Sequence, residues 1–232
     1  MIDRIRFAQT LKEYNIELTE KQMKDYYIGA NWVSFPKTTK KRNAMVLKKW
    51  RKTLADAIEK EIFLQYIFQK QWQAVKKYAN EKGISIIGDA PIFVAYDSAD
   101  VWANQKLFRL DSKGFPLCIA GVPPDYFSKT GQLWGNPLYR WDYHRETGYQ
   151  WWLSRLWYCF RLYDVTRIDH FRGFDEYYSI PYGDENAKNG HWEKGPGMEL
   201  FTAVEKALGK REVIAEDLGF ITDSVRQLVK DS

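Results

Sequence analysis

Strand-like segments alternate with amphipathic ones along residues 56–232, and each strand-like segment is followed by an acidic residue. The strand-like segments are 84–88, 164–168 and 212–215, and the acids that follow them are Asp89, Asp169 and Glu216. The segments 56–81, 147–163 and 197–208 carry apolar residues at helical spacing, and a last helix is expected to start at Thr222. This alternation indicates an α/β fold with a parallel sheet and crossover helices.

The three acids are expected to converge, because the carboxyl ends of parallel strands carry the functional site of such folds. Two carboxyl groups about 5–5.5 Å apart on either side of a sugar make a retaining glycosidase site. Arg167 stands two residues before Asp169 and would favour its ionised form. Glu216 follows an apolar segment, an environment that favours a protonated acid.

Two other interpretations of these acids stay open at this point. Acids after strands are common in solvated loops. Asp89, Asp169, His170 and Glu216 could ligate a metal, but they show no recognised ligand spacing. We therefore expect neither a metal nor a cofactor.

The remaining segments are less regular. Residues 1–55 are polar and are predicted to form a helical or irregular N-terminal segment, distinct from residues 56–232. Residues 90–145 are rich in glycine and proline turns and show little periodicity, so we predict a long inserted loop region. A loop of this length within a compact chain is usually functional.

Composition limits the classes of partner. The net charge of +5 is spread along the 232 residues, which argues against a nucleic-acid partner. The absence of a long apolar run and of an apolar N-terminal core predicts no membrane span and no signal peptide, hence a cytoplasmic protein. Cys118 and Cys159 are expected to be free thiols. The 10 Trp, 15 Tyr and 13 Phe could supply ring platforms for sugars or for bases.

Six segments together resemble one enzyme family. They are IGDAPIFV (87–94), DSADVWAN (97–104), AGVPPDYFS (120–128), GQLWGNPLY (131–139), RIDHFRGF (167–174) and VIAEDLG (213–219). In this order they are similar to motifs of the amylomaltases, the 4-α-glucanotransferases of glycoside hydrolase family 77. The similarity is strong over residues 56–232 and weaker before them.

The resemblance implies the central portion of a (β/α)8 TIM barrel that transfers α-1,4-glucan segments between maltooligosaccharides. By motif, Asp169 is the nucleophile and Glu216 the acid/base. The residues expected to bind substrate are Asp89, Asp125, Tyr126, Phe127, Ser128, Trp134, Asn136, Arg167 and His170. For Tyr126 and Trp134 the alternative is simple packing.

The sequence departs from the family pattern in length. Further barrel strands and a third catalytic acid, an Asp beside a His, are expected but do not follow Glu216. We therefore expect a fragment that is inactive alone, with open strand edges that favour self-association or a complementing chain piece. An α-glucan hydrolase and an inactive carbohydrate-binding fragment are the alternatives.

Overall fold

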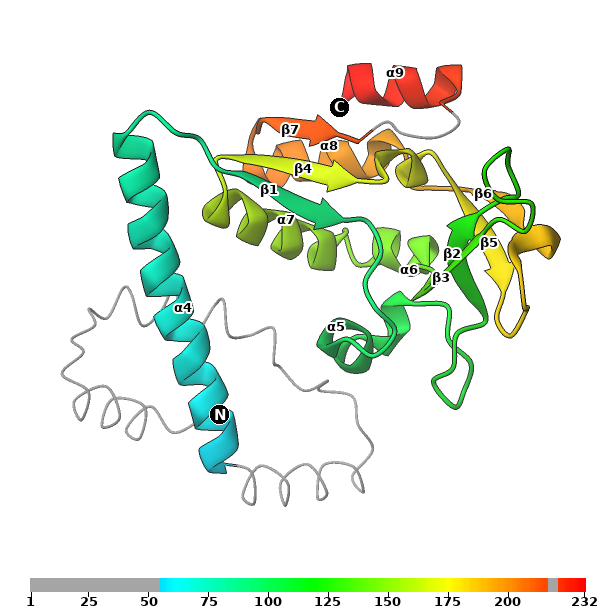
Figure 1. Cartoon of the computed structure of the whole chain (residues 1–232), viewed down its shortest axis with the longest axis horizontal. Helices are drawn as coiled ribbons and strands as arrows, with labels where there is room; N and C mark the ends of the chain where they lie inside the picture. Colours follow the sequence, from blue (N-terminus) through cyan, green and yellow to red (C-terminus); the bar gives the residue numbers. More distant parts are fainter. Residues whose placement is uncertain (1–54, 217–220) are drawn as a thin grey trace. The chain divides into compact units, whose positions relative to one another are not determined.

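The computed structural model describes residues 55–216 and 221–232, with side chains from residue 59 onwards (Figure 1). The chain divides into two compact units, residues 1–75 and 76–232. Helix α4 (Ala55–Glu81) supplies the described part of the first unit and extends into the second. The predicted N-terminal segment 1–55 lies almost entirely outside the described residues, so its boundary stays a prediction.

The second unit contains the predicted parallel sheet. Strands β1 (Ile87–Pro91), β4 (Val165–Asp169) and β7 (Val213–Ala215) lie in the order β1-β4-β7, all parallel. Helix α7 (Gln150–Leu162) contacts β1 and β4, and α8 (Met198–Leu208) packs beside α7 (Figure 1). The parallel α/β layer is therefore confirmed, whereas its membership of a complete (β/α)8 barrel stays a prediction.

Residues alternate between the two faces of this sheet. Gly88, Ala90, Thr166 and Ile168 are buried, whereas the residues between them are at least partly exposed. Because Asp89, Arg167 and Asp169 occupy those alternate positions, they share the face opposite the buried residues. This face carries the candidate site.

The first strand begins later than predicted. Residues 84–86 lie outside the ladder, because the Asp164 carboxylate accepts the backbone N–H of Ile86 at 2.8 Å. The strand instead continues to Pro91, which pairs with Asp169 and needs no N–H donor on an edge strand. Asp89 is consequently the middle residue of β1, and its predicted position just past the strand end is wrong.

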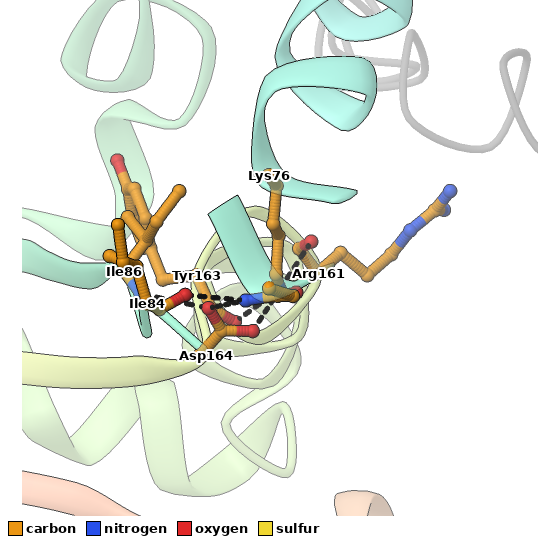
Figure 2. A network of polar contacts seen from close by, with 7 residues as sticks. Lys76, Ile84, Ile86, Arg161, Tyr163 and Asp164 are labelled. Atoms are coloured by element: carbon orange, nitrogen blue, oxygen red, sulfur yellow. Dashed lines mark hydrogen bonds and ion pairs between the residues drawn. The ribbon is translucent and has the colours of Figure 1, made fainter. Parts of the chain in front are cut away.

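A polar network fixes the opposite end of the sheet (Figure 2). Lys76 donates to the Tyr163 carbonyl at 2.8 Å and lies 3.3 Å from the Asp164 carboxylate. The same carboxylate accepts the Asn80 amide at 2.8 Å. The end of α4, the end of α7 and the starts of β1 and β4 are thus joined at one carboxylate.

The segment 90–145, predicted as loop, contains regular structure. It forms α5 (Ala99–Ala103), the 3-10 turn η2 (Gln105–Leu107), β2 (Cys118–Val122), β3 (Gln132–Pro137) and α6 (Trp141–Glu146). Strands β2 and β3 join β5 (Glu176–Pro181) and β6 (His191–Lys194) in an antiparallel sheet of order β3-β2-β5-β6. Strand β2 contains Gly121, a residue type that ordinarily marks turns. Glycine is needed there because a Cβ would lie 2.1 Å from the Gln132 carbonyl oxygen.

One short turn leads from the parallel sheet into the antiparallel one. The 3-10 turn η3 (Phe171–Phe174) leads from β4 into β5, and η4 (Ala187–Asn189) lies between β5 and β6. Helix α9 (Asp223–Asp231) begins after Thr222, whose hydroxyl accepts the Val225 N–H at 3.3 Å, as the sequence predicts. No helix in the described ranges is long and apolar enough to cross a membrane. Both cysteines are free.

Aromatic side chains form much of the buried core. Tyr139 is 1 % exposed and lies within 5.9 Å, centre to centre, of the rings of Phe93, Phe108 and Trp141. Its hydroxyl donates to the Ile92 carbonyl at 2.7 Å. This contact holds the chain where it leaves β1, so many of the aromatic residues serve packing.

Candidate active site

Two strand-end carboxylates lie on neighbouring strands. Asp169 is the last residue of β4, and Glu216 directly follows β7. Because Ile168 and Ala215 are partners in the parallel ladder, the next positions are Asp169 and Glu216. The Glu216 N–H donates to the Ile168 carbonyl at 3.0 Å, which extends the ladder to the acid. Neighbouring strands are about 4.8 Å apart, so the backbones of Asp169 and Glu216 lie side by side at one strand edge.

A hydrogen bond strengthens this arrangement. The backbone N–H of His170 donates to Oε2 of Glu216 at 2.8 Å. The residue next to Asp169 therefore fixes the direction of the Glu216 side chain. The structure brings the predicted nucleophile and the predicted acid/base to one strand edge.

Arg167 bridges Asp89 and Asp169. Its guanidinium donates to Oδ1 of Asp89 at 2.5 Å and to Oδ1 of Asp169 at 3.0 Å. The hydrogen bond to Asp89 is the main reason why the pKa of Arg167 is raised. Asp89 lies opposite Arg167 in the register, about 7 Å below the strand end. Asp89 and Asp169 therefore bind the same guanidinium, and Asp89 does so from a position below the strand end.

His170 makes the turn after β4. Its backbone is left-handed, with φ 53° and ψ 45°. This conformation costs a non-glycine residue about 1 kcal/mol or more, so the surrounding contacts hold it in place. Its ring packs edge-on against Trp134, with centres 4.8 Å apart. Burial, followed by the charge of Arg172, lowers the pKa of His170 to about 4, although Asp169 acts in the opposite direction. The imidazole is therefore neutral at neutral pH.

Strand β3 brings two further predicted residues towards this turn. Trp134 contacts His170 and keeps 37 % of its surface exposed, so part of the indole can meet a ligand. The Asn136 amide donates to the Val94 carbonyl at 2.9 Å and ties β3 to the segment after β1. Trp134 can therefore both pack on His170 and contact a ligand, whereas the amide group of Asn136 donates to a backbone carbonyl.

Residues 125–128 form a tight turn between β2 and β3. Oδ1 of Asp125 accepts the N–H of Phe127 at 2.9 Å and the N–H of Ser128 at 2.6 Å. The Ser128 hydroxyl donates to the Gly131 carbonyl at 2.8 Å. The Asp125 and Ser128 side chains therefore shape the turn. Tyr126 and Phe127 are 95 % and 94 % exposed, so their rings stand in solvent rather than against the acids.

A sequence model of the 4-alpha-glucanotransferases, glycoside hydrolase family 77, matches residues 10–232. The chain belongs to this family. A 4-alpha-glucanotransferase of Aquifex aeolicus is 46 % identical over 218 residues, which are 94 % of this chain and 44 % of the relative. One of Streptococcus pneumoniae is 48 % identical over 96 % of this chain and 45 % of the relative.

A solved structure agrees with this membership of the 4-alpha-glucanotransferase family. The amylomaltase from Streptococcus agalactiae in complex with acarbose superposes with a TM-score of 0.80 at 39 % identity. The match covers 97 % of this chain and 46 % of that protein. The chain thus spans less than half the length of the relatives that it matches. The family resemblance read from the six motifs is confirmed.

Sequence reasoning missed the residues that support the strand ends in this member of the family. Arg155 of α7 donates to the Pro91 carbonyl at 2.6 Å, and Tyr139 holds the next carbonyl along the chain. The available indication was an arginine beside the buried Leu156 on an amphipathic helix. Its partner is a backbone carbonyl, which no side-chain pattern reveals.

The site can support acid/base and nucleophilic chemistry through its own carboxylates. Nowhere in the described ranges do three His, Cys, Asp or Glu side chains gather as metal ligands. Two neighbouring carboxylates with an adjacent guanidinium can attack a sugar carbon and protonate its leaving oxygen. This is the chemistry that the geometry favours.

Proposed function

We propose that this chain supplies the nucleophile and the acid/base of a 4-α-glucanotransferase, which moves α-1,4-glucan segments between maltooligosaccharides with retention. The observation that carries the proposal is the placement of Asp169 and Glu216 at one strand edge. Family membership gives the reaction class, because the curated relatives are named for it. The proposal includes the larger architecture: residues 56–232 belong to a (β/α)8 barrel.

The proposed mechanism has two displacements. Asp169 attacks the anomeric carbon while the Glu216 carboxylic acid protonates the departing glucan oxygen. Glu216 then takes a proton from the 4-OH of an incoming maltooligosaccharide, which displaces the carboxylate and restores both groups. Arg167 donates hydrogen bonds to both Asp169 and Asp89 and so places its positive charge between the two carboxylates.

The two acids can be told apart by their dependence on the leaving group. In the complete protein, Asp169→Asn should reduce transfer from maltotriose by at least about 10⁴-fold, because nothing replaces the nucleophile. Glu216→Gln should cost about 10²–10⁴-fold on maltotriose but little in the first step on an aryl maltoside with a good leaving group. Products are measured by chromatography and aryl release by absorbance.

A matched control uses another acid. Asp142, whose side chain is 68 % exposed, pairs only loosely with Arg140 at 3.8 Å, and Asp142→Asn should keep wild-type activity. Equal losses for Asp169→Asn and Glu216→Gln on both substrates would contradict the assigned roles. Glucose and maltose without any longer maltooligosaccharide would show hydrolysis instead of transfer.

A further inference from the structure

The peptide unit between Asp169 and His170 is held at both of its ends. Its carbonyl oxygen accepts the backbone N–H of Ile92 at 3.3 Å. Its N–H, which belongs to His170, donates to Oε2 of Glu216 at 2.8 Å. Because a peptide unit is planar, these two hydrogen bonds fix its orientation and, with it, the backbone of Asp169. The left-handed conformation of His170 depends on this orientation, since rotation of the unit would change its φ of 53°.

A side chain of α7 holds the peptide unit that supplies the first of these donors. The Pro91 carbonyl and the Ile92 N–H belong to one trans peptide unit, so they point in opposite directions. Arg155 donates to the Pro91 carbonyl at 2.6 Å, and the Ile92 N–H donates to the Asp169 carbonyl. A hydrogen-bonded series therefore runs from Arg155 through two peptide units to Glu216.

The start of this series is placed by two indoles. The guanidinium carbon of Arg155 lies 5.2 Å from the ring centres of both Trp151 and Trp152, within the range of a cation–π contact. Both indoles are buried, and Trp151 donates to the Asp100 carboxylate of α5 at 3.2 Å. The direction of the guanidinium is thus set by the aromatic core.

The segment that follows β1 has further supports. The Tyr139 hydroxyl donates to the Ile92 carbonyl at 2.7 Å and accepts from Arg155 at 3.4 Å. The Phe93 ring lies against Tyr139 on one side and His170 on the other, with centres 5.9 and 6.4 Å apart. Two successive carbonyls and a ring therefore hold this segment where its N–H meets Asp169.

We propose that Arg155 is a positioning residue for both proposed acids: through the two peptide units it holds the backbone of Asp169 and directs the His170 N–H at Glu216. Aligned hydrogen bonds polarise one another, and this series begins at a cation. The consequence for the reaction rests on the function proposed above. The hydrogen-bonded series itself does not.

Amide hydrogen exchange in the complete protein, followed by NMR residue by residue, tests the series. Arg155→Met removes the donor and keeps an unbranched side chain against the two indoles. The amide hydrogens of Ile92 and His170 should then exchange at least about fivefold faster, because both peptide units open more easily. Arg155→Lys keeps a charged donor and should recover part of the protection.

Kinetics on two substrates test the positioning role. In Arg155→Met, kcat for maltotriose should fall about 10–100-fold with little change in KM, since the reacting groups are displaced while the other glucan contacts remain. The first step on an aryl maltoside with a good leaving group should fall similarly. That step needs Asp169 in place but little protonation by Glu216. Arg155→Lys should again lie between the two proteins.

Arg161 provides a matched control on the same helix. Its guanidinium carbon lies 4.7 Å from the centre of the Trp157 ring, and its side chain points away from the polar contacts in Figure 2. Arg161→Met removes a comparable cation–π contact and should leave amide exchange and kcat unchanged. Tyr139→Phe, which releases the Ile92 carbonyl, should act in the same direction as Arg155→Met and replaces it if that variant does not fold.

Three outcomes would overturn the inference. Unchanged exchange of the His170 amide in Arg155→Met or, if that variant does not fold, in Tyr139→Phe would show that the series does not hold the turn. Faster exchange with unchanged kcat would remove the positioning role. An equal loss of kcat in Arg161→Met would show a general loosening of α7. If Asp169→Asn and Glu216→Gln instead keep transfer activity, the proposed function fails and the exchange result still stands.

Discussion

His144 offers a sharp test of the aromatic core because it is a fully buried titratable group. It lies in α6 and is 0 % exposed, with the rings of Tyr139, Trp141 and Trp151 centred 5.2–6.0 Å away. Burial lowers the pKa of His144 to about 4, while the Leu107 backbone and the Asp142 charge act in the opposite direction. The perturbation is His144→Leu, which removes the titration and keeps an apolar side chain of similar size.

The expected magnitude follows from the difference between the folded and unfolded pKa of His144. In the unfolded chain the imidazole has its ordinary pKa of about 6.5. Between pH 6.5 and about 4 the unfolded state binds a proton that the folded state does not, so acid favours unfolding. Each pH unit is worth about 1.4 kcal/mol, and the total loss by pH 4 is about 3 kcal/mol. That is a large share of the 5–15 kcal/mol typical of a folded domain.

The assay is urea unfolding of the chain at pH 7, 6, 5 and 4, followed by tryptophan fluorescence. His170 also has a lowered pKa and affects both proteins, so the difference between wild type and His144→Leu isolates His144. This difference in unfolding free energy should move by about 3 kcal/mol in favour of the variant between pH 7 and pH 4. Parallel pH curves for the two proteins would refute the reasoning.

Two further changes test the frame of the parallel sheet. Gly88→Ala should lower the unfolding free energy by about 1–3 kcal/mol in a urea titration, because the new Cβ would lie 1.8 Å from the Tyr163 ring. Asp164→Asn should cost about 1–2 kcal/mol at pH 7, a value reduced for partial solvent exposure, because the carboxylate accepts the N–H of Ile86 and the amide of Asn80. The Ile86 hydrogen bond, followed by Asn80 and the nearby ammonium group, lowers the pKa of Asp164. Its contribution is therefore complete above its ordinary pKa and is lost as pH falls through the lower folded value, so the variant should approach wild type in acid.

The parallel layer was predictable because its signals are local. The strands that end at Asp169 and Glu216 follow amphipathic helices, and each helix buries a regular set of apolar residues. The start of β1 was not predictable from the sequence. It depends on the Asp164 carboxylate, which accepts the N–H of Ile86 although the two residues are 78 positions apart along the chain. The apolar residues 84–86 are therefore excluded from the strand by a tertiary contact.

The antiparallel sheet was concealed by the residues that build it. Gly121, Gly135 and Pro137 belong to β2 and β3, yet glycine and proline ordinarily mark turns. Here the glycine in β2 permits a close backbone approach, which is a property of the assembled sheet. Turn composition alone could not distinguish such strands from a loop.

In the charged stretch around Asp169, strand periodicity predicts the direction of side chains only as far as the end of β4. Up to the strand end, alternation assigns Arg167 and Asp169 to the site face and Ile168 to the buried face. At His170 the backbone turns left-handed, and the alternation is lost. Arg172 follows in η3, where the strand alternation no longer applies, and it is buried with its guanidinium over the Trp192 ring. One positive φ angle therefore separates the arginine that touches Asp169 from the arginine that packs on Trp192.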